Sequence, residues 1–454
     1  MAKYQQYEEY KDSGAEWLGE VPIHWKVLRL KQVIEYGSSV SYGIVQPGEA
    51  LDEGVKFIQT TNISKGSFDL NDFQKTSVLI ESNYPRSRLK GGEVILGIRA
   101  SIGAAFVVPD TFRGINLSRG IARIATNKSL TSEFLVWYFK ADAVEKYWGL
   151  SKQGSTFSEV SIETVRELYV PIPNTSDQTQ IANFLDHETA QIDTLIDKQQ
   201  TLIQLLKEKR QAVISHAVTK GLNTDAPMKD SGVEWLGDVP EHWEFIKFDY
   251  VINAVGDIDH YMPSSTDSGI PYVMTGDLRD LVSEISFENC KQVAHSDYVK
   301  LSRKIKASKD DIIFARYATI GTLSYVDIDA DFLVSYSCVI IKPNSERTSG
   351  KYLFRYLKSQ AFLQAITMYI NSNTQCNVGI DSLKNVKVIM PPLSEQEEII
   401  NFLNDAVVKI DRLLDKAKSA ITLMQERRIA LISAAVTGKI DVRGWESKVS
   451  DSTY

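Results

Sequence analysis

The fold is decided by a stretch of sequence that the chain contains twice. Residues 176–222 read SDQTQIANFLDHETAQIDTLIDKQQTLIQLLKEKRQAVISHAVTKGL, and residues 394–440 read SEQEEIINFLNDAVVKIDRLLDKAKSAITLMQERRIALISAAVTGKI. Each position of the first copy matches the position 218 residues further on, so that Ile181 corresponds to Ile399 and Arg210 to Arg428. The repeat therefore predicts two equivalent segments of the same structure.

In both copies the apolar residues recur at alternating steps of four and three, with Lys, Glu, Gln and Asp between them. Such a heptad pattern is typical of a coiled coil rather than of a short core helix. A helix of about 40 residues is on the order of 60 Å long, so each copy could act as a spacer. The expected apolar seam consists of Ile181, Leu185, Ile192, Leu195, Leu202, Leu206 and Val213, and of Ile399, Leu403, Ile410, Leu413, Met424 and Leu431.

The residues at the ends of both copies are those that start and stop helices. Ser176 and Ser394 stand where an N-cap is expected, and prolines just upstream keep the preceding chain extended. Gly221 and Gly438 can take the left-handed conformation that ends many helices.

Composition predicts a soluble, cytoplasmic protein of two to four domains. The chain has 454 residues, of which 43% are hydrophobic and 24% charged, which is ordinary for globular proteins. No apolar run approaches the 18 residues of a membrane span, and the N-terminus does not resemble a signal peptide. Its three cysteines lack zinc or disulfide spacing. The net charge of −7 argues against a protein that binds nucleic acid without partners.

The repeat extends beyond the helices into a shorter motif. Residues 11–26 read KDSGAEWLGEVPIHWK and return at 229–244 as KDSGVEWLGDVPEHWE, with 12 of 16 positions identical. We interpret this motif as a packed aromatic clip. His24 and His242 have no second ligand-type residue at a suitable spacing, so a metal or catalytic role for them is not indicated.

Two regions of equal span lie between each clip and the following helix, and they agree only in patches. Both contain a β-branched strand pair around glycine, an amphipathic helix and an extended segment that leads into the long helix. The matched patches are 92–108 with 310–326, 133–148 with 351–366, and 167–173 with 385–392. We therefore expect two equivalent α+β domains that share a framework and differ in detail.

No catalytic motif is present in the sequence. We find no P-loop, no G-x-S-x-G and no H-E-x-x-H, and Met390–Leu393 lacks the leading Asp or Asn of an amino-methyltransferase motif. The chain is therefore expected to recognise or to scaffold rather than to catalyse.

Three motifs together resemble the specificity subunit of type I restriction–modification systems. They are the duplicated D-S-G-x-E-W-L-G-x-V-P-x-H-W clip, the P-P-L-S-E-Q-E-x-I entry to the second helix and its R-R-x-A-L-I-S-A-A-V-T-G-K-I exit. The resemblance covers residues 11–443. It implies two target recognition domains, each reading one half of a split site in double-stranded DNA, and an antiparallel two-helix spacer that fixes the gap between the halves.

The resemblance also implies partners. Two methyltransferase subunits would supply S-adenosylmethionine chemistry on adenine N6, and restriction/translocase subunits would use ATP and Mg. The chain itself would hold no cofactor, no metal and no catalytic residue. Because the first clip has no helix before it, we expect it to pack against the end of the second helix and to close a pseudo-circular arrangement.

The predicted division of the chain follows from the repeat. The segments are an N-terminal clip (1–26), target recognition domain 1 (27–175), spacer helix 1 (176–222), a tether with the second clip (223–244), target recognition domain 2 (245–393), spacer helix 2 (394–443) and a disordered tail (444–454).

Candidate DNA-binding residues are basic, aromatic and amide side chains in the two α+β domains, because Arg reads guanine, Asn and Gln read adenine, and Lys mostly contacts phosphate. In the first domain they are Tyr84, Arg86, Arg88, Lys90, Arg99, Arg113, Arg119, Gln153, Ser155 and Thr156. In the second domain they are Arg303, Lys304, Lys306, Lys309, Arg316, Tyr317, Asn371, Asn373, Thr374 and Gln375.

Three other functions are compatible with parts of this pattern. The chain could serve a type IIB-like system, it could be a protein–protein scaffold whose two domains bind peptides, or it could be a nuclease or methyltransferase half with unrecognised motifs. Incubation of the chain alone with DNA and a methyl donor separates the last of these from a DNA-reading subunit.

Overall fold

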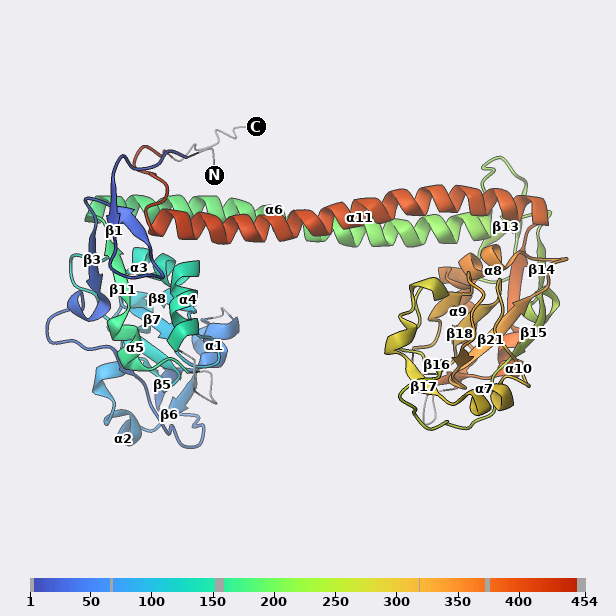
Figure 1. The fold of residues 1–454 in the computed structure, drawn as a ribbon, viewed down its shortest axis with the longest axis horizontal. Helices are drawn as coiled ribbons and strands as arrows, with labels where there is room; N and C mark the ends of the chain where they lie inside the picture. Colours follow the sequence, from blue (N-terminus) through green and yellow to red (C-terminus); the bar gives the residue numbers. More distant parts are fainter. Residues whose placement is uncertain (1–3, 66–67, 152–158, 318, 372–375, 447–454) are drawn as a thin grey trace. The chain divides into compact units, whose positions relative to one another are not determined.

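The computed structural model describes residues 4–65, 68–151, 159–317, 319–371 and 376–446. The chain forms two compact units, residues 1–199 with 419–454, and residues 200–418. The boundary falls inside both long helices, α6 (Thr175–Lys220) and α11 (Leu393–Val436), so each unit contains the first half of one helix and the last half of the other (Figure 1).

The first unit combines a clip, a mixed α+β domain and the helix halves. Its strands are β1 (Tyr10–Asp12), β2 (Glu20–Pro22), β3 (Lys26–Arg29), β4 (Ser41–Tyr42), β5 (Val55–Ile58), β6 (Gln74–Thr76), β7 (Val94–Gly97), β8 (Ala105–Val107), β9 (Asn116–Leu117), β10 (Ile121–Ile124) and β11 (Tyr169–Ile172). Its shorter helices are α1 (Thr60–Lys65), α2 (Val78–Glu81), α3 (Ser132–Phe139), α4 (Asp142–Ser151) and α5 (Ile162–Glu167).

The second unit repeats this plan. Its strands are β12 (Met228–Asp230), β13 (Asp238–Pro240), β14 (Glu244–Lys247), β15 (Ile252–Gly256), β16 (Ile270–Val273), β17 (Lys291–Val293), β18 (Ile312–Ala315), β19 (Leu323–Tyr325), β20 (Leu333–Val334), β21 (Cys338–Pro343), β22 (Ile370–Asn371), β23 (Asn377–Val378) and β24 (Lys387–Met390). Its shorter helices are α7 (His295–Leu301), α8 (Gly350–Leu357), α9 (Gln360–Thr367) and α10 (Ile380–Asn385).

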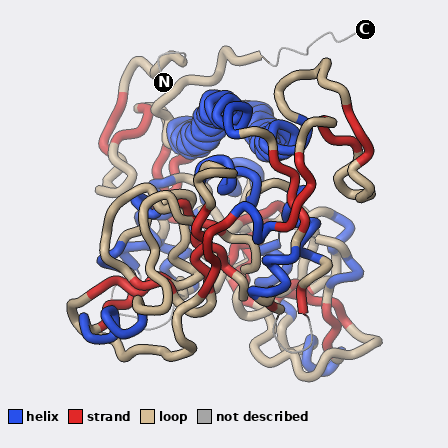
Figure 2. The backbone as a smooth tube through the Cα atoms, turned by 90° about the vertical axis from the view of Figure 1, so that its right-hand side faces the viewer, coloured by secondary structure: helices blue, strands red, loops and turns tan. Residues whose placement is uncertain are grey.

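The two domains have the same sheet topology. An antiparallel sheet has the strand order β4-β10-β7-β8 in the first and β15-β21-β18-β19 in the second. A three-stranded sheet has the order β6-β5-β9 in the first and β17-β16-β20 in the second, each with one parallel pairing. Each globular part combines helices with largely antiparallel sheets, which agrees with the predicted α+β class (Figure 2).

Each predicted strand pair around glycine is present. β7 pairs with β8 and β18 with β19, and the glycines that follow the first strand, Gly103 and Gly321, have φ angles of 86° and 92°. A side chain would be strained in this left-handed conformation, so glycine is the residue that lets the chain turn here.

The segments predicted as single amphipathic helices are wrong in one respect, because each is broken into two short helices. α3 ends at Phe139 and α4 starts at Asp142, while in the second domain Ser359 caps the start of α9 and accepts a hydrogen bond from the Phe362 N–H at 3.3 Å. Residues 134–139 of α3 are all buried, since this helix lies between α6 and the β7–β8 pair (Figure 1).

A buried glutamine at the start of each long helix fixes the helix to its domain. Gln178 donates to the carbonyls of Ser129 and Pro173 at 2.8 and 2.9 Å and accepts from the Thr131 N–H at 2.8 Å. Gln396 bonds the corresponding backbone groups in the second unit. Both side chains are completely buried with their hydrogen-bonding groups in use, which is the condition under which a buried amide stabilises a fold.

The capping prediction is wrong for both long helices, by two residues in the first, and in the second because the helix starts at Leu393 and so contains Ser394. The first helix starts at Thr175, and Asn174 rather than Ser176 acts as the cap, because its Oδ1 accepts the Asp177 N–H at 2.8 Å. At the other ends, Gly221 and Gly438 have φ angles of 76° and 75°, as expected for glycines that terminate helices.

In each unit the beginning of one long helix lies beside the end of the other. In the first unit Arg428 Nε donates to Asp193 Oδ1 at 2.8 Å, and in the second Arg210 Nε donates to Asp411 Oδ1 at 2.9 Å. Arg210 and Arg428 are equivalent positions of the repeat, and so are Asp193 and Asp411. The two ion pairs therefore differ only in which helix supplies the arginine. The helices therefore run in opposite directions within each unit.

The apolar seam between the helices differs from the prediction at three positions. Leu195, Leu202 and Leu413 are 46%, 42% and 50% exposed, whereas Ile196 and Leu414 are buried. The next buried side chain after Ile192 and Ile410 comes four residues later rather than three. In each helix the residues at both spacings are apolar, and the helical period turns the one at spacing four inward.

Each clip packs against the end of the long helix that precedes it in the repeat. The Tyr10 hydroxyl donates to the Gly438 carbonyl at 3.1 Å, and Gln5 bridges to Asp441. In the second unit the Lys220 ammonium donates to the Leu236 carbonyl at 3.2 Å. The predicted contact between the N-terminal clip and the end of the second helix is thus confirmed.

Part of the predicted disordered tail is packed. The Trp445 ring lies edge-on to Phe184 with centroids 5.5 Å apart, and its carbonyl accepts from Gln180. The large apolar ring explains this contact, and the remainder of the tail, 447–454, lies outside the described residues. No helix among the described residues is both long and apolar enough to cross a bilayer.

Candidate nucleic-acid interface

The candidate residues of the first domain fall at two opposite ends of the sheet β4-β10-β7-β8. Ser41 at the start of β4 pairs with Arg123 near the end of β10, and Tyr42 pairs with Ala122. Arg86, Arg88 and Lys90 lie at the end where β4 begins, whereas Arg99 and Arg119 lie at the end where β10 begins. The sequence-predicted group therefore divides into two separate basic sites.

The first of these sites, here called the basic pocket, is a cavity of about 620 Å³. Arg86, Arg88 and Lys90 line it together with Arg123 and Ser38. Arg86 and Lys90 make no ion pair with another described residue, so their charges are available to a ligand. The pocket has the charge and the donors to bind an anion such as a DNA phosphate.

Arg88 is less available because it is already paired. Its guanidinium donates two hydrogen bonds to Glu81, at 2.7 and 2.6 Å, and Asn116 donates a third at 3.0 Å. The bond from Arg88 holds the pKa of Glu81 below its usual value in spite of burial. This carboxylate is therefore ionised at neutral pH and cancels one of the pocket's charges.

Arg123 forms the floor of the basic pocket and was missed by sequence reasoning. Its side chain is 4% exposed and pairs with Glu93 at 2.7 Å, while its Nη1 donates to Ser38 and to the Arg86 carbonyl at 3.4 Å. A lone arginine within the apolar strand sequence Ile121–Ile124 is the signal that could have found it. Buried charges require partners, and such a residue indicates an internal ion pair.

The second site, here called the Arg99 hollow, is a cavity of about 300 Å³ at the other end of the sheet. Arg99 and Arg119 line it with polar side chains from the start of α1, the residue before it and the turn before β10, which are Thr60, Thr61, Gln59 and Ser118. Arg99 is ion-paired with Glu159, and its Nε is buried without a described partner.

Two further candidates of the first domain belong to neither site. The Tyr84 carbonyl accepts from Asn116 and Ser87, which is a structural role for its backbone. Arg113 is exposed and lies 3.6 Å from Asp110, an ion pair that adds little stability at a solvated surface.

Most candidate cations of the second domain are neutralised. Lys304 pairs with Asp257 at 3.1 Å and Lys306 with Asp331 at 2.9 Å, and the latter contact raises the pKa of Lys306. Arg303 and Lys309 are exposed and make no ion pair with another described residue. Among the described candidates, the second domain therefore offers two cations without an ion pair, Arg303 and Lys309, and the first offers three, Arg86, Lys90 and Arg119.

Arg316 is buried rather than presented at the surface. It pairs with Asp257, and its guanidinium carbon lies 4.5 Å from the centroid of the Tyr317 ring. Burial opposes ionisation of Asp257, but bonds from Lys304 and His260 and the charge of Arg316 leave its pKa below the usual value. We therefore expect Arg316 to support its neighbours and Tyr317 to face the ligand.

Several polar candidates lie outside the described residues. They are Gln153, Ser155 and Thr156 in the first domain, and Asn373, Thr374 and Gln375 in the second. The backbone of Asn371 belongs to β22, which pairs with β23.

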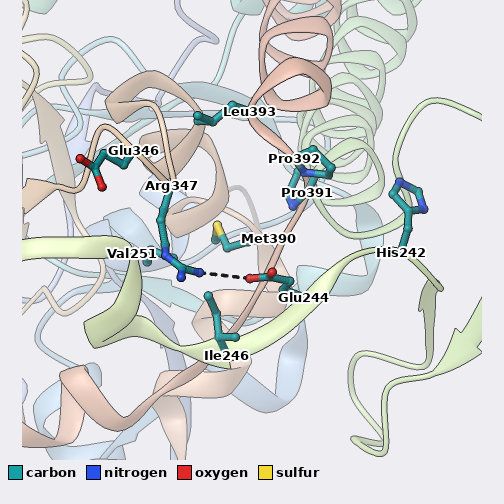
Figure 3. A pocket seen from close by; sticks show the side chains of 10 residues that line it. All are labelled: His242, Glu244, Ile246, Val251, Glu346, Arg347, Met390, Pro391, Pro392 and Leu393. Carbon is teal, nitrogen blue, oxygen red and sulfur yellow. Dashed lines mark hydrogen bonds and ion pairs between the residues drawn. The ribbon is translucent and has the colours of Figure 1, made fainter.

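A cavity of about 560 Å³ in the second unit contains none of the candidates (Figure 3). It lies where β14 and the end of β24 meet the start of α11, and two of its charged residues, Glu244 and Arg347, face each other at 3.3 Å. Among the residues that the structure describes, no cluster of His, Cys, Asp and Glu could hold a metal ion.

A sequence profile described as "Type I restriction modification DNA specificity domain" matches the chain twice, at residues 22–205 and 240–422. The putative type I restriction enzyme MjaX specificity subunit of Methanocaldococcus jannaschii is 21% identical over 98% of this chain and 99% of its own length. The type I restriction enzyme EcoKI specificity subunit of Escherichia coli K12 is 21% identical over 95% of this chain and 92% of its own.

Two solved structures share the fold. A chain of a type I restriction–modification system, solved in work on complex assembly and conformational transition, has a TM-score of 0.69 at 16% identity and matches 92% of this chain and 99% of its own length. The HsdS subunit of Thermoanaerobacter tengcongensis has a TM-score of 0.54 at 16% identity, over 92% and 98%. With two profile matches that cover most of its length, the chain belongs to the type I restriction–modification DNA specificity family, as a non-catalytic specificity subunit.

Proposed function

We propose that each α+β domain of this chain reads one half of a bipartite site in double-stranded DNA, and that α6 and α11 form an antiparallel coiled coil that sets the gap between the halves. The observation that carries this proposal is the pair of matched ion pairs, Arg210 with Asp411 and Arg428 with Asp193. An approximate two-fold rotation axis between the two repeats would require the same contact to occur twice between oppositely directed helices. Duplex DNA has the same kind of axis.

The charge distribution supports DNA as the ligand. Arg86 and Lys90 in the basic pocket, Arg119 in the Arg99 hollow, and Arg303 and Lys309 in the second domain offer exposed cations on both domains. Phosphate contacts from such residues position a protein on DNA, while side chains that reach the base edges confer specificity. The overall charge of −7 means that partners would supply much of the remaining basic surface.

The proposed partners carry the chemistry. Two methyltransferase subunits would bind S-adenosylmethionine and methylate adenine N6, for which the base must leave the stack. Restriction/translocase subunits would bind ATP and Mg, and the complex would act in the cytoplasm. This chain would contribute recognition only.

The experiment is to express the chain with its methyltransferase partner in a host without adenine methylation and to map N6-methyladenine by single-molecule sequencing. The proposal predicts a two-part motif with a fixed unspecified gap and one modified adenine in each half, on opposite strands. A single continuous motif would contradict it. Absence of methylation by an assembled complex would favour the protein–protein scaffold, and a site cleaved by the same assembly would favour the type IIB-like alternative.

A further inference from the structure

The two domains place different residues at the same two positions of their equivalent sheets. In the first domain Gly97 of β7 pairs with Ile121 of β10, and in the second Ala315 of β18 pairs with Cys338 of β21. In the first domain Arg99 lies two residues after Gly97, and Arg119 lies two residues before Ile121. The corresponding residues in the second domain are Tyr317 and Tyr336.

The equivalence extends to the backbone around the first position. Arg99 makes an isolated antiparallel bridge to Glu159, and Tyr317 makes the same bridge to Asn377, 218 residues later in each case. The next residues also agree, because the Val160 N–H donates to the Ile98 carbonyl and the Val378 N–H to the Arg316 carbonyl, at 2.9 and 3.1 Å. The framework is thus common to both domains, and the side chains are what differ.

In the first domain the two arginines are presented as hydrogen-bond donors. One amino group of Arg99 is held by Glu159, which orients the guanidinium plane, and Nε is buried, so the terminal amino groups Nη1 and Nη2 are the donors that a ligand can reach. The backbone below is tightly packed, since a Cβ on Gly120 would lie 2.4 Å from Thr60 Cγ2. Arg119 is exposed at the rim, where its N–H donates to the Ile44 carbonyl at 2.9 Å.

In the second domain the two tyrosines are presented as flat rings on a rigid support. The Tyr336 ring stacks on His260 with centroids 5.1 Å apart and an interplanar angle of 26°. Arg316 lies over the other ring, that of Tyr317, and is itself fixed by Asp257. A tyrosine offers one hydroxyl and an apolar face, so it cannot form the forked contact that a guanidinium makes.

Resting on the proposed function, we infer that these two positions determine the specificity of each half-site, and that Arg99 and Arg119 read guanine in the first. A guanidinium donates two parallel hydrogen bonds to guanine O6 and N7, which no other base offers in the major groove. Tyr317 and Tyr336 read the second half-site through ring contacts and a single hydroxyl bond, so its sequence depends less on G·C pairs. Glu159 is a positioning residue for Arg99.

The test uses Arg99→Lys and Arg119→Lys in the full complex with the methyltransferase, followed by methylation mapping. Lysine keeps the positive charge but cannot donate the two parallel hydrogen bonds of a guanidinium. Each variant should therefore relax the specificity of the motif at one G·C pair of the first half-site. Discrimination at that pair should fall about 5- to 150-fold, the range for one bidentate base contact. The second half-site and the gap should stay unchanged.

Arg113→Lys is the matched control, because Arg113 is an exposed arginine of the same domain that does not line the hollow. It should leave the motif as it is. Glu159→Ala should relax the same pair as Arg99→Lys, whereas Glu159→Gln, which keeps an acceptor oxygen, should preserve it. A residue that only held the fold together would not reproduce this pattern.

An unchanged first half-site in both lysine variants would overturn the inference. If a variant complex assembles but does not methylate, its affinity for the cognate and a scrambled site is measured, and an equal loss for both would also overturn it by showing a phosphate contact. Arg119 is exposed, so Arg119→Lys carries the test if Arg99→Lys does not assemble. A wild-type complex without a two-part motif would instead refute the proposed function.

Discussion

The substitution Gln178→Ala should loosen the first domain from its long helix. The amide of Gln178 makes three hydrogen bonds with the backbone of residues 129, 131 and 173, and it is completely buried. Alanine would remove the side-chain partner of two carbonyls and one N–H, of which the bond to Pro173 is buried and the other two are partly buried. The loss should therefore be larger than that of an exposed glutamine on the same helix.

The magnitude follows from these three bonds. A hydrogen bond contributes about 1 kcal/mol net, and a buried group left unsatisfied costs about 1–3 kcal/mol. We expect the first unit to lose about 3 kcal/mol. Since 1.4 kcal/mol corresponds to a factor of ten, amide exchange that depends on opening this junction should become about 100-fold faster.

Hydrogen–deuterium exchange with mass spectrometry measures this effect region by region. Gln178→Ala should accelerate exchange in α3 and at the start of α6 and leave α8 and the start of α11 unchanged. Gln396→Ala should produce the reverse pattern, because it makes the equivalent bonds in the second unit. Gln200→Ala, on an exposed position of α6, should change neither region.

Two results would refute this reasoning. One is a Gln178→Ala variant whose exchange matches the wild type, which would mean that the junction bonds contribute no net stability. The other is an equal acceleration in both units, which would mean that the glutamine acts on the whole chain rather than on its own junction.

Two further predictions concern local contacts. Glu81→Gln should destabilise the first domain by about 1–3 kcal/mol at pH 7, because Arg88 loses a charged acceptor. The pKa of Glu81 is lower in the folded state, so this stabilisation is present above the unfolded pKa of about 4.3 and is lost as the pH falls through the folded pKa. In denaturant titrations the difference in stability between variant and wild type should therefore shrink below about pH 4. Gly438→Ala should displace the first clip, since its Cβ would lie 2.3 Å from Pro22 Cδ, whereas Gly14→Ala has the same φ of 75° and no atom within 4 Å. Thermal denaturation should show a larger loss for Gly438→Ala, and equal losses would refute the clash.

The sequence alone predicted the elements whose signal is local. The repeated heptad stripe predicted the starts of both long helices to within one residue, and their ends to within two residues for α6 and seven for α11. The glycine-centred patches placed β7 with β8 and β18 with β19. The seam was misassigned at Leu195 and Leu413, because adjacent apolar residues fit the stripe equally well until the partner helix is present.

Contacts between distant residues could not be predicted in this way. Gln178 looks like any amide in a first helical turn, and only the folded loop around residue 129 shows that it is buried. The candidate site shows the same limit. The residue types were predicted, but one carboxylate, that of Asp257, pairs with both Lys304 and Arg316 and lies 47 and 59 positions before them in the sequence. Which cations are free therefore depends on tertiary structure.

The central claim, that the helices set the gap between two half-sites, is tested most directly by shortening both of them. In the proposed coiled coil the register of the two ion pairs would continue to the middle of the helices, so that residues 198–204 would face 417–423. Deleting both segments removes about 10 Å at 1.5 Å per residue, which is about three base pairs at 3.4 Å each. Methylation mapping should show the same two half-sites with a gap shorter by about three base pairs. An unchanged gap, or altered half-sites, would contradict the account.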